Sequence, residues 1–133
     1  MRRIAASVAI VVALLAPAAC AIGSPGGYAG YSTPSDALST FFVSARNADY
    51  AKTYEAYYGH YHDLVAKDEF VSHRAQASRL TAYRVDSLAA RGDSAVATVT
   101  LTFAPAGGGG ATRTTTVRED LVREAGGWKI RVW

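Results

Sequence analysis

The chain of 133 residues is half hydrophobic and 19% charged, which is the composition of a single globular domain and excludes a largely disordered protein. Its formal net charge is +3, but Arg2 and Arg3 belong to an expected export signal, and the rest carries 12 basic against 11 acidic residues. That rest has no basic cluster, so nucleic-acid binding is not expected. The single cysteine, Cys20, excludes an intrachain disulfide.

The first 19 residues have the order of regions that is typical of an export signal: a positive start, an uncharged apolar run over residues 4–16, and small residues before Cys20. The apolar run is shorter than the ~20 residues that a membrane-spanning helix needs. Ala18-Ala19-Cys20 resembles the lipobox of bacterial lipoproteins, in which the cysteine is diacylated and becomes the first residue. Pro17 departs from that pattern, which has an aliphatic residue at this position.

We therefore expect residues 1–19 to be a lipoprotein-type signal peptide. Acyl chains such as palmitate on Cys20 would then hold the protein on the extracytoplasmic face of a bacterial membrane. The alternative is a secreted soluble protein, cleaved after the Ala16-Pro17-Ala18 sequence. Residues 20–33 are rich in Gly, Ser, Pro, Ala and Tyr without apolar periodicity, which predicts a flexible tether in which Tyr28 and Tyr31 are linker residues. The folded domain is expected over residues 34–133.

Three helices are expected at the start of this domain. The first begins near Thr33-Pro34, and its apolar residues recur at helical spacing. They are Leu38, Phe41, Phe42 and Ala45. The second begins at Asp49 and ends at Gly59, which places four tyrosines on one face: Tyr50, Tyr54, Tyr57 and Tyr58. The third runs from Ala66 to about Ser78, with Phe70 and either His73 or Arg74 facing inward.

The histidines are not expected to bind a metal. His60 and His62 follow Gly59 in a predicted turn, and a His-x-His pair needs a third ligand in compatible geometry. Asp63 and His73 could supply one, but nothing in the sequence brings them together. We expect solvated histidines and no metal or other cofactor.

The remainder of the chain predicts an antiparallel sheet of about four strands. Residues 80–91 alternate loosely, with Tyr83 and Val85 on one face together with Ser87 and Ala89. Residues 95–103 alternate strictly, with threonines on the outer face. Their inward positions are Ala95, Ala97, Val99, Leu101 and Phe103. The glycine-rich residues 105–110 predict a loose hairpin loop before a strand over residues 112–123.

The last strand follows the turn at Gly126-Gly127. Its alternation predicts Trp128, Ile130 and Val132 on the inner face, with Lys129 and Arg131 on the outer face.

Glu119 is an exception on the otherwise apolar inner face, because it is in phase with Val117 and Leu121. Burial would raise the pKa of its carboxyl and let it act as a base. A bulge or a strand end would instead turn it toward water.

Taken in order, these segments resemble the nuclear transport factor 2-like (cystatin-like) superfamily, and within it small bacterial lipoproteins that carry a domain of unknown function. The resemblance covers about residues 33–133 and depends on order and spacing rather than on a single motif. The matching residues are Thr33-Pro34, Phe41-Phe42, Ala45–Tyr50, Glu69-Phe70, Asp93–Val99, Leu121-Val122 and Gly127–Ile130. It implies an α+β domain in which helices and a curved antiparallel sheet form a cone.

The superfamily contains enzymes and non-catalytic binding modules, so the resemblance alone does not decide the function. We favour a non-catalytic, lipid-anchored cell-envelope protein that binds a small apolar ligand or a protein partner. One alternative is an isomerase or dehydratase that uses Glu119 as the base with Tyr54 or Tyr58, and another is a structural or assembly module. Homodimerisation through the sheet is common in the superfamily. The expected pocket residues are Tyr54, Tyr58, Tyr83, Glu119 and Trp128.

Overall fold

The computed structural model describes residues 30–131, which form four helices followed by four strands. The signal peptide, Cys20 and most of the tether lie outside the described residues, as does Val132. The helices are α1 (Pro34–Arg46), α2 (Tyr50–Glu55), α3 (Gly59–Leu64) and α4 (Lys67–Gln76). The strands are β1 (Arg79–Arg91), β2 (Ser94–Ala104), β3 (Arg113–Glu124) and β4 (Gly127–Arg131).

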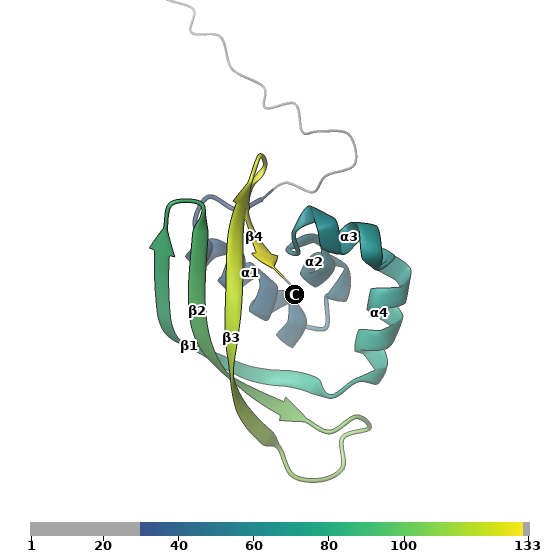
Figure 1. The fold of residues 1–133 in the computed structure, drawn as a ribbon. Coiled ribbons are helices and arrows are strands. Elements are labelled where there is room, and N and C mark those ends of the chain that lie inside the picture. Colours follow the sequence, from purple (N-terminus) through teal and green to yellow (C-terminus); the bar gives the residue numbers. More distant parts are fainter. Residues whose placement is uncertain (1–29, 132–133) are drawn as a thin grey trace, which may run out of the picture.

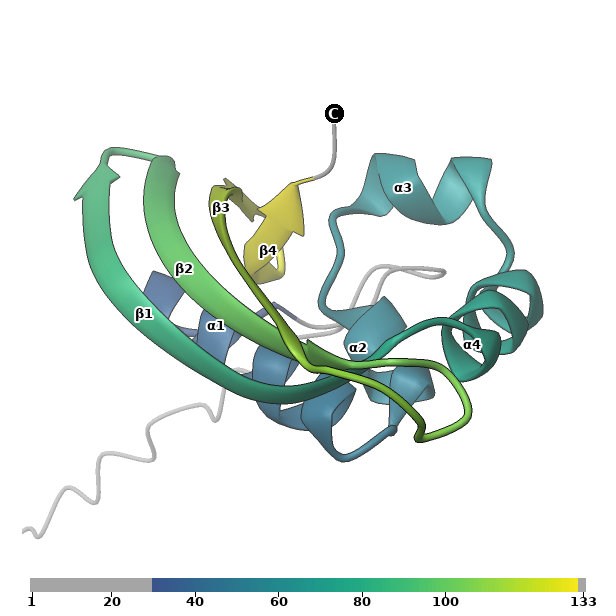
Figure 2. The same cartoon turned by 90° about the horizontal axis from the view of Figure 1, so that it is seen from below.

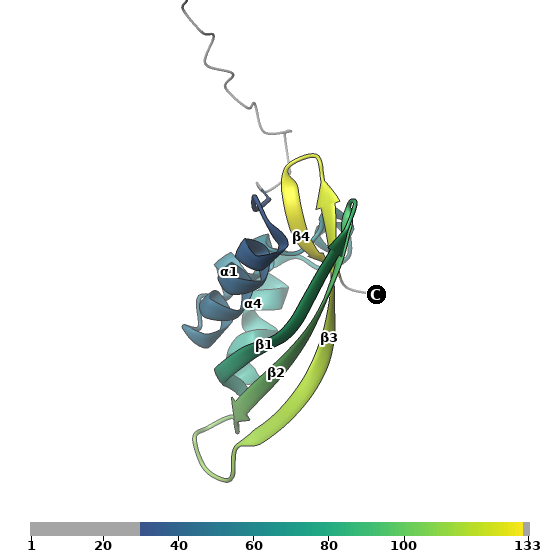
Figure 3. The same cartoon turned by 90° about the vertical axis from the view of Figure 1, so that its left-hand side faces the viewer.

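The domain has two layers, with the helices on one face of an open antiparallel sheet (Figures 1 and 3). The strand order is β1-β2-β3-β4, so each strand pairs with its neighbour in sequence. The long strands bend across the helices, as Figure 2 shows. The α+β class and the four-stranded antiparallel sheet are confirmed. No helix within residues 30–131 is long and apolar enough to cross a membrane.

Helix α1 forms as the sequence predicts. The Thr33 hydroxyl accepts a hydrogen bond from the Asp36 backbone N–H at 3.1 Å, and Pro34 occupies the first turn, where its missing N–H costs nothing. The predicted apolar stripe is buried against the sheet. One face of α1 therefore supplies a large part of the core.

The second predicted helix is wrong in its extent. Helix α2 ends at Glu55, and Gly59 begins α3 instead of ending a helix. The chain leaves the helix because the Ile130 N–H of β4 donates to the Ala56 carbonyl at 2.8 Å and the Tyr58 N–H donates to the Ile130 carbonyl at 2.9 Å. Tertiary pairing with β4 overrides the local helical spacing, so Tyr57 does not continue the face that carries Tyr50 and Tyr54.

The histidine pair lies in α3 and not in a turn. His62 Nε2 is 2.8 Å from the Tyr54 carbonyl oxygen, so this ring is part of the packing between α2 and α3. His60 packs near Tyr58, with ring centroids 5.9 Å apart.

Strand β2 confirms its predicted alternation. Ala95, Ala97, Val99 and Leu101 are buried, whereas Thr100 and Thr102 on the other face form hydroxyl contacts with Thr116 and Thr114 of β3. Strand β1 does not keep its predicted face. Its register with β2 shifts between Leu80 and Ala82 and again between Val85 and Ser87, so the alternation is lost and Val85 is exposed.

Strand β4 is covered on the edge that does not pair with β3. Tyr31 exchanges two backbone hydrogen bonds with Trp128, at 2.8 and 3.2 Å, and the Ala56–Tyr58 segment pairs with Ile130. Tyr31 also packs against the core. Tyr31 is therefore part of the folded domain, although the sequence placed it in the tether.

The burial of Lys129 also differs from the prediction. Trp128 and Ile130 are buried as predicted, but Lys129 is only 2% exposed instead of facing water. Its ammonium group donates to the Glu55 carbonyl at 3.1 Å, and burial lowers the pKa of the amine. The Ala56–Tyr58 segment pairs with β4 on the side that the strand pattern had assigned to solvent, which explains why Lys129 is buried.

Candidate functional site

A cavity of about 160 Å³ lies between the helices and the sheet. Five aromatic rings line it, and they come from four different segments of the chain. They are Phe41 and Phe42 of α1, Tyr57 before α3, Phe70 of α4 and Phe103 of β2. The Tyr57 ring lies 5.1 Å from that of Phe41 and 5.6 Å from that of Phe70, both edge to face. These contacts fix the rings as a rigid apolar wall.

Glu119 is the one carboxylate that lines this cavity. Strand pairing places it opposite Ala97 of β2. Burial, and to a smaller degree the nearby charge of Asp120, raises the pKa of Glu119 to about 7. Within residues 30–131 no hydrogen bond or ion pair satisfies this carboxyl group. Its hydrogen-bonding capacity is therefore available to water or to a ligand in the cavity.

Three further polar side chains line the cavity, Thr53, Tyr57 and Arg74. The Thr53 hydroxyl donates to the Asp49 carbonyl at 3.1 Å, so Tyr57 and Arg74 are the two that bear on Glu119. Burial raises the pKa of the Tyr57 hydroxyl, and the negative charges of Tyr61 and Glu119 add to this effect. The hydroxyl is therefore neutral at physiological pH and can donate a hydrogen bond. Arg74 acts in the opposite direction on the Tyr57 pKa. The guanidinium also lies over the Tyr50 ring, 5.8 Å from its centroid.

This arrangement can hold an apolar body and one polar group. Because the Glu119 carboxyl titrates near pH 7, it can either donate or accept a hydrogen bond at neutral pH. An apolar cavity of about 150 Å³ accommodates benzene in another protein, so this one has room for a single ring or a short chain. A carboxyl group with this pKa is also suited to removing a proton from a bound molecule.

Of the five pocket residues expected from the sequence, Glu119 lines the cavity and the other four do not. The Tyr54 hydroxyl donates to the Val65 carbonyl at 2.7 Å, and Trp128 is buried in the core. Tyr83 stacks on Phe42, with centroids 5.2 Å apart. Tyr58 belongs to the segment that pairs with β4, and its N–H donates to the Ile130 carbonyl.

Sequence reasoning missed Tyr57 as a cavity residue because it assigned that residue to a helical face. Phe70 was expected to face inward, and so was Arg74 as one of two options, and both line the cavity. Their spacing at i and i+4 on α4 was the signal that places both on one face of the helix. Among the described residues no cluster of three or more His, Asp or Glu side chains could hold a metal ion.

Several solved structures share this fold. A SEC-C motif-containing protein from Rhodopseudomonas palustris aligns with a TM-score of 0.65 and 17% identity, over 77% of this chain and 79% of that one. A protein from Thiobacillus denitrificans, designated a calcium/calmodulin-dependent protein kinase type II association domain, aligns at 0.59 and 16%, over 75% and 90%. A Campylobacter jejuni protein designated an NTF2-like transpeptidase aligns at 0.48 and 13%, over 76% and 100%.

At these identities the likeness to the first two proteins shows the fold alone. No protein-family model matches the sequence, and no curated protein matches it. The observed architecture is an α+β domain with an open four-stranded antiparallel sheet.

Proposed function

We propose that this protein is a lipid-anchored envelope domain of the nuclear transport factor 2-like type, whose curved sheet and helices enclose a small, cone-shaped binding pocket. Its ligand is a small, largely apolar molecule with one hydrogen-bonding group. The observation that carries the proposal is Glu119, a carboxyl without a partner in the described chain, on the wall of a cavity lined by five aromatic rings.

Physical chemistry favours an occupied cavity. The described chain gives the Glu119 carboxyl no hydrogen-bond partner, and a ligand in the cavity that hydrogen-bonds to it would supply one. Aromatic walls then gain about 25 cal/mol for each Å² of apolar surface taken out of water. The cavity and the threonine-covered outer face of β2 and β3 weigh against a purely structural module.

The binding proposal can be tested with two probes of similar shape, phenol and toluene, followed by amide NMR titration of the purified protein at pH 8. We expect shifts at cavity residues for both probes and tighter binding of phenol, whose hydroxyl can donate to the Glu119 carboxylate. Glu119→Gln should remove most of the preference for phenol, and Ala45→Leu should weaken both probes about tenfold by filling the cavity. Thr98→Val on the outer face is the control. Binding that neither cavity variant changes would contradict the proposal.

An enzyme remains the second candidate, because Glu119 with a pKa near 7 and the neutral Tyr57 hydroxyl line the same cavity. The base would remove a proton next to a carbonyl while the hydroxyl stabilises the enolate oxygen. Cyclopentanone in D₂O tests this. Deuterium incorporation above the buffer rate that is lost in Glu119→Gln favours the enzyme, and incorporation at the buffer rate favours a binding protein.

Membrane attachment is a separate part of the proposal and depends on Cys20 and the small residues before it. Metabolic labelling with a fatty acid in a bacterial host should label the wild-type protein and not Cys20→Ala. Absence of label on both would contradict a lipid anchor and favour soluble secretion.

A further inference from the structure

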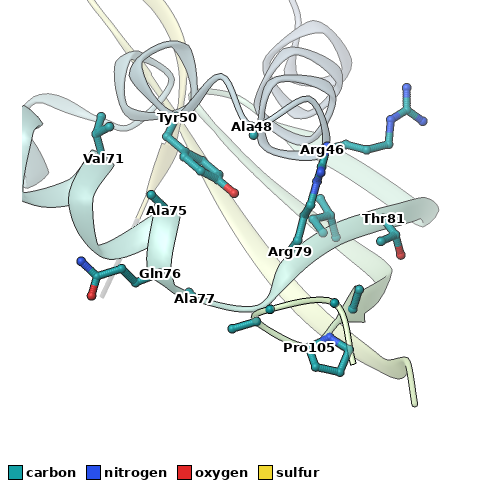
Figure 4. A pocket seen from close by; sticks show the side chains of 15 residues that line it. Arg46, Ala48, Tyr50, Val71, Ala75, Gln76, Ala77, Arg79, Thr81 and Pro105 are labelled. Carbon is teal, nitrogen blue, oxygen red and sulfur yellow. The ribbon is translucent and has the colours of Figure 1, made fainter. Parts of the chain in front are cut away.

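A second hollow, an open groove of about 1060 Å³, lies at the end of the sheet that carries the β2–β3 loop (Figure 4). It runs between the ends of α1 and α4, the start of β1 and the loop that begins at Pro105. Its lining shares Leu80 with the interior cavity and no other residue. Because Leu80 is only 3% exposed, its side chain separates the two hollows.

The walls of this groove are built from small and apolar side chains. Val71 and Ala75 of α4 form one side, Ala104 and Pro105 the other, and the Tyr50 ring lies between α1 and α4. Gly107 and Gly108 continue the loop side, so no large side chain narrows the groove there. A hydrocarbon chain could lie along such walls without leaving polar groups unsatisfied, whereas a peptide backbone would require partners for its own N–H and C=O groups.

The charged residues in the lining have one sign. Arg46 and Arg79 line the groove, and no acidic residue does. Neither arginine takes part in an ion pair within residues 30–131. Figure 4 shows the Arg79 side chain running from the start of β1 toward the end of α1, and the Tyr50 hydroxyl pointing into the space beside α4. The Arg46 side chain extends away from both. Arg46 lies over the Tyr83 ring, 6.0 Å from its centroid.

The two helix ends near the groove oppose this positive charge but do not cancel it. Helices α1 and α4 end at Arg46 and Gln76, and each C-terminus contributes roughly half a negative charge. Two guanidinium groups outweigh them. Arg74, one turn before the end of α4, adds a third positive charge nearby. The groove thus combines an apolar channel with a cationic, hydrogen-bonding centre.

We propose that this groove binds an anionic amphiphile, a molecule with a carboxylate head and an alkyl chain. The carboxylate pairs with the Arg79 guanidinium, whose planar fork matches its two oxygens, and accepts a hydrogen bond from the Tyr50 hydroxyl. The alkyl chain lies along the alanine and valine wall of α4. This site is independent of the interior cavity and of the ligand proposed for it.

Three probes below their micelle concentrations test this assignment by amide NMR titration of the purified protein: decanoate, acetate as the head alone, and decyltrimethylammonium as the same chain with a cationic head. We expect decanoate to shift the amides of Ala75, Ala77 and Gly107, and acetate to bind at least tenfold more weakly. Arg79→Gln should weaken decanoate binding tenfold or more, which is the loss expected for one charged hydrogen-bonding partner.

Arg91→Gln is the matched control, since Arg91 is an exposed arginine in the β1–β2 hairpin at the other end of the sheet. It should leave decanoate affinity unchanged, and both variants should retain the wild-type melting temperature. The assignment is overturned if decanoate does not bind, if the cationic probe binds as well as decanoate, or if Arg79→Gln has no effect. Decanoate shifts confined to interior residues such as Leu101 would also overturn it, and would place the amphiphile in the interior cavity.

Discussion

The two ends of the sheet differ in how their backbone and side chains are used. At the closed end, defined by the β3–β4 turn, Gly30 and Tyr31 seal the edge of β4 over Trp128 (Figure 1). At the loop end, defined by the β2–β3 loop, the chain leaves an open groove, and the interior cavity extends toward it beside Phe103. The tight backbone contacts and the hollows that could hold a ligand therefore lie in separate parts of one small domain.

The closed end depends on two glycines in direct backbone contact. The Gly30 N–H donates to the Gly126 carbonyl at 2.7 Å, and a Cβ on Gly30 would lie 2.5 Å from the Gly127 carbonyl carbon. Gly127 has a φ of +118°, and a Cβ there would lie 2.7 Å from the Tyr31 carbonyl oxygen. At the loop end, a Cβ on Gly108 would meet nothing within 4 Å. The closed end therefore tolerates no added atom, whereas the loop end has space.

The largest expected effect is the loss of Trp128. We expect Trp128→Ala to lower the free energy of unfolding by about 3–5 kcal/mol, because the ring is 3% exposed and packs in the core. Phe103→Ala at the loop end should cost about 1–2 kcal/mol, since that ring is only partly buried. Urea denaturation of both variants measures the difference, and equal losses would break the comparison between the two ends.

The two glycine sites sharpen the same comparison. Gly127→Ala should cost about 2–3 kcal/mol, because the new Cβ meets backbone atoms and the φ angle is unfavourable for alanine. Gly108→Ala has only its positive φ of +79° to overcome and should cost about 1 kcal/mol. Thermal melts of the two variants test this. If Gly127→Ala lost less stability than Gly108→Ala, the backbone at the closed end would have moved to make room for the new Cβ, which would contradict the comparison.

Glu119 predicts a pH dependence of stability with a definite sign. Its pKa in the folded protein is about 7, above the ordinary 4.5, so its contribution to stability is complete below pH 4.5 and is lost as the pH rises through 7. Glu119→Gln stays neutral and should be about 1–2 kcal/mol more stable than wild type at pH 8, but equally stable at pH 4. Urea denaturation at both pH values checks this. A variant less stable than wild type at pH 8 would contradict it.

The sequence predicts the parts of this fold that depend on local periodicity. The stripe on α1, the alternation of β2 and the burial of Trp128 and Ile130 follow from spacing alone. The extent of α2 and the burial of Lys129 do not, because both depend on the segment around Ala56 pairing with β4, more than 70 residues away in the chain. The predicted face of β1 is wrong for a different reason, because a loosely alternating sequence does not show where the bulges lie.

The candidate site was predictable only in part, for the same reason. The phase of β3 singled out Glu119, and the spacing of α4 placed Phe70 inward. Tyr57 enters the cavity from a segment that local spacing assigned to a helix, so its position required the tertiary structure. The open groove that Arg46 and Arg79 line is formed by three regions that are distant in sequence. None of these regions has a sequence pattern that predicts the groove.

The most direct test of the account is the pKa of the Glu119 carboxyl, measured by ¹³C NMR titration of the folded protein. A value near 7 that shifts downward when phenol binds is the result expected for a desolvated carboxyl facing an apolar cavity, because the ligand hydroxyl stabilises the carboxylate. A value near 4.5 that does not respond to phenol would show that Glu119 is solvated, and would remove the basis for a binding site in the interior cavity.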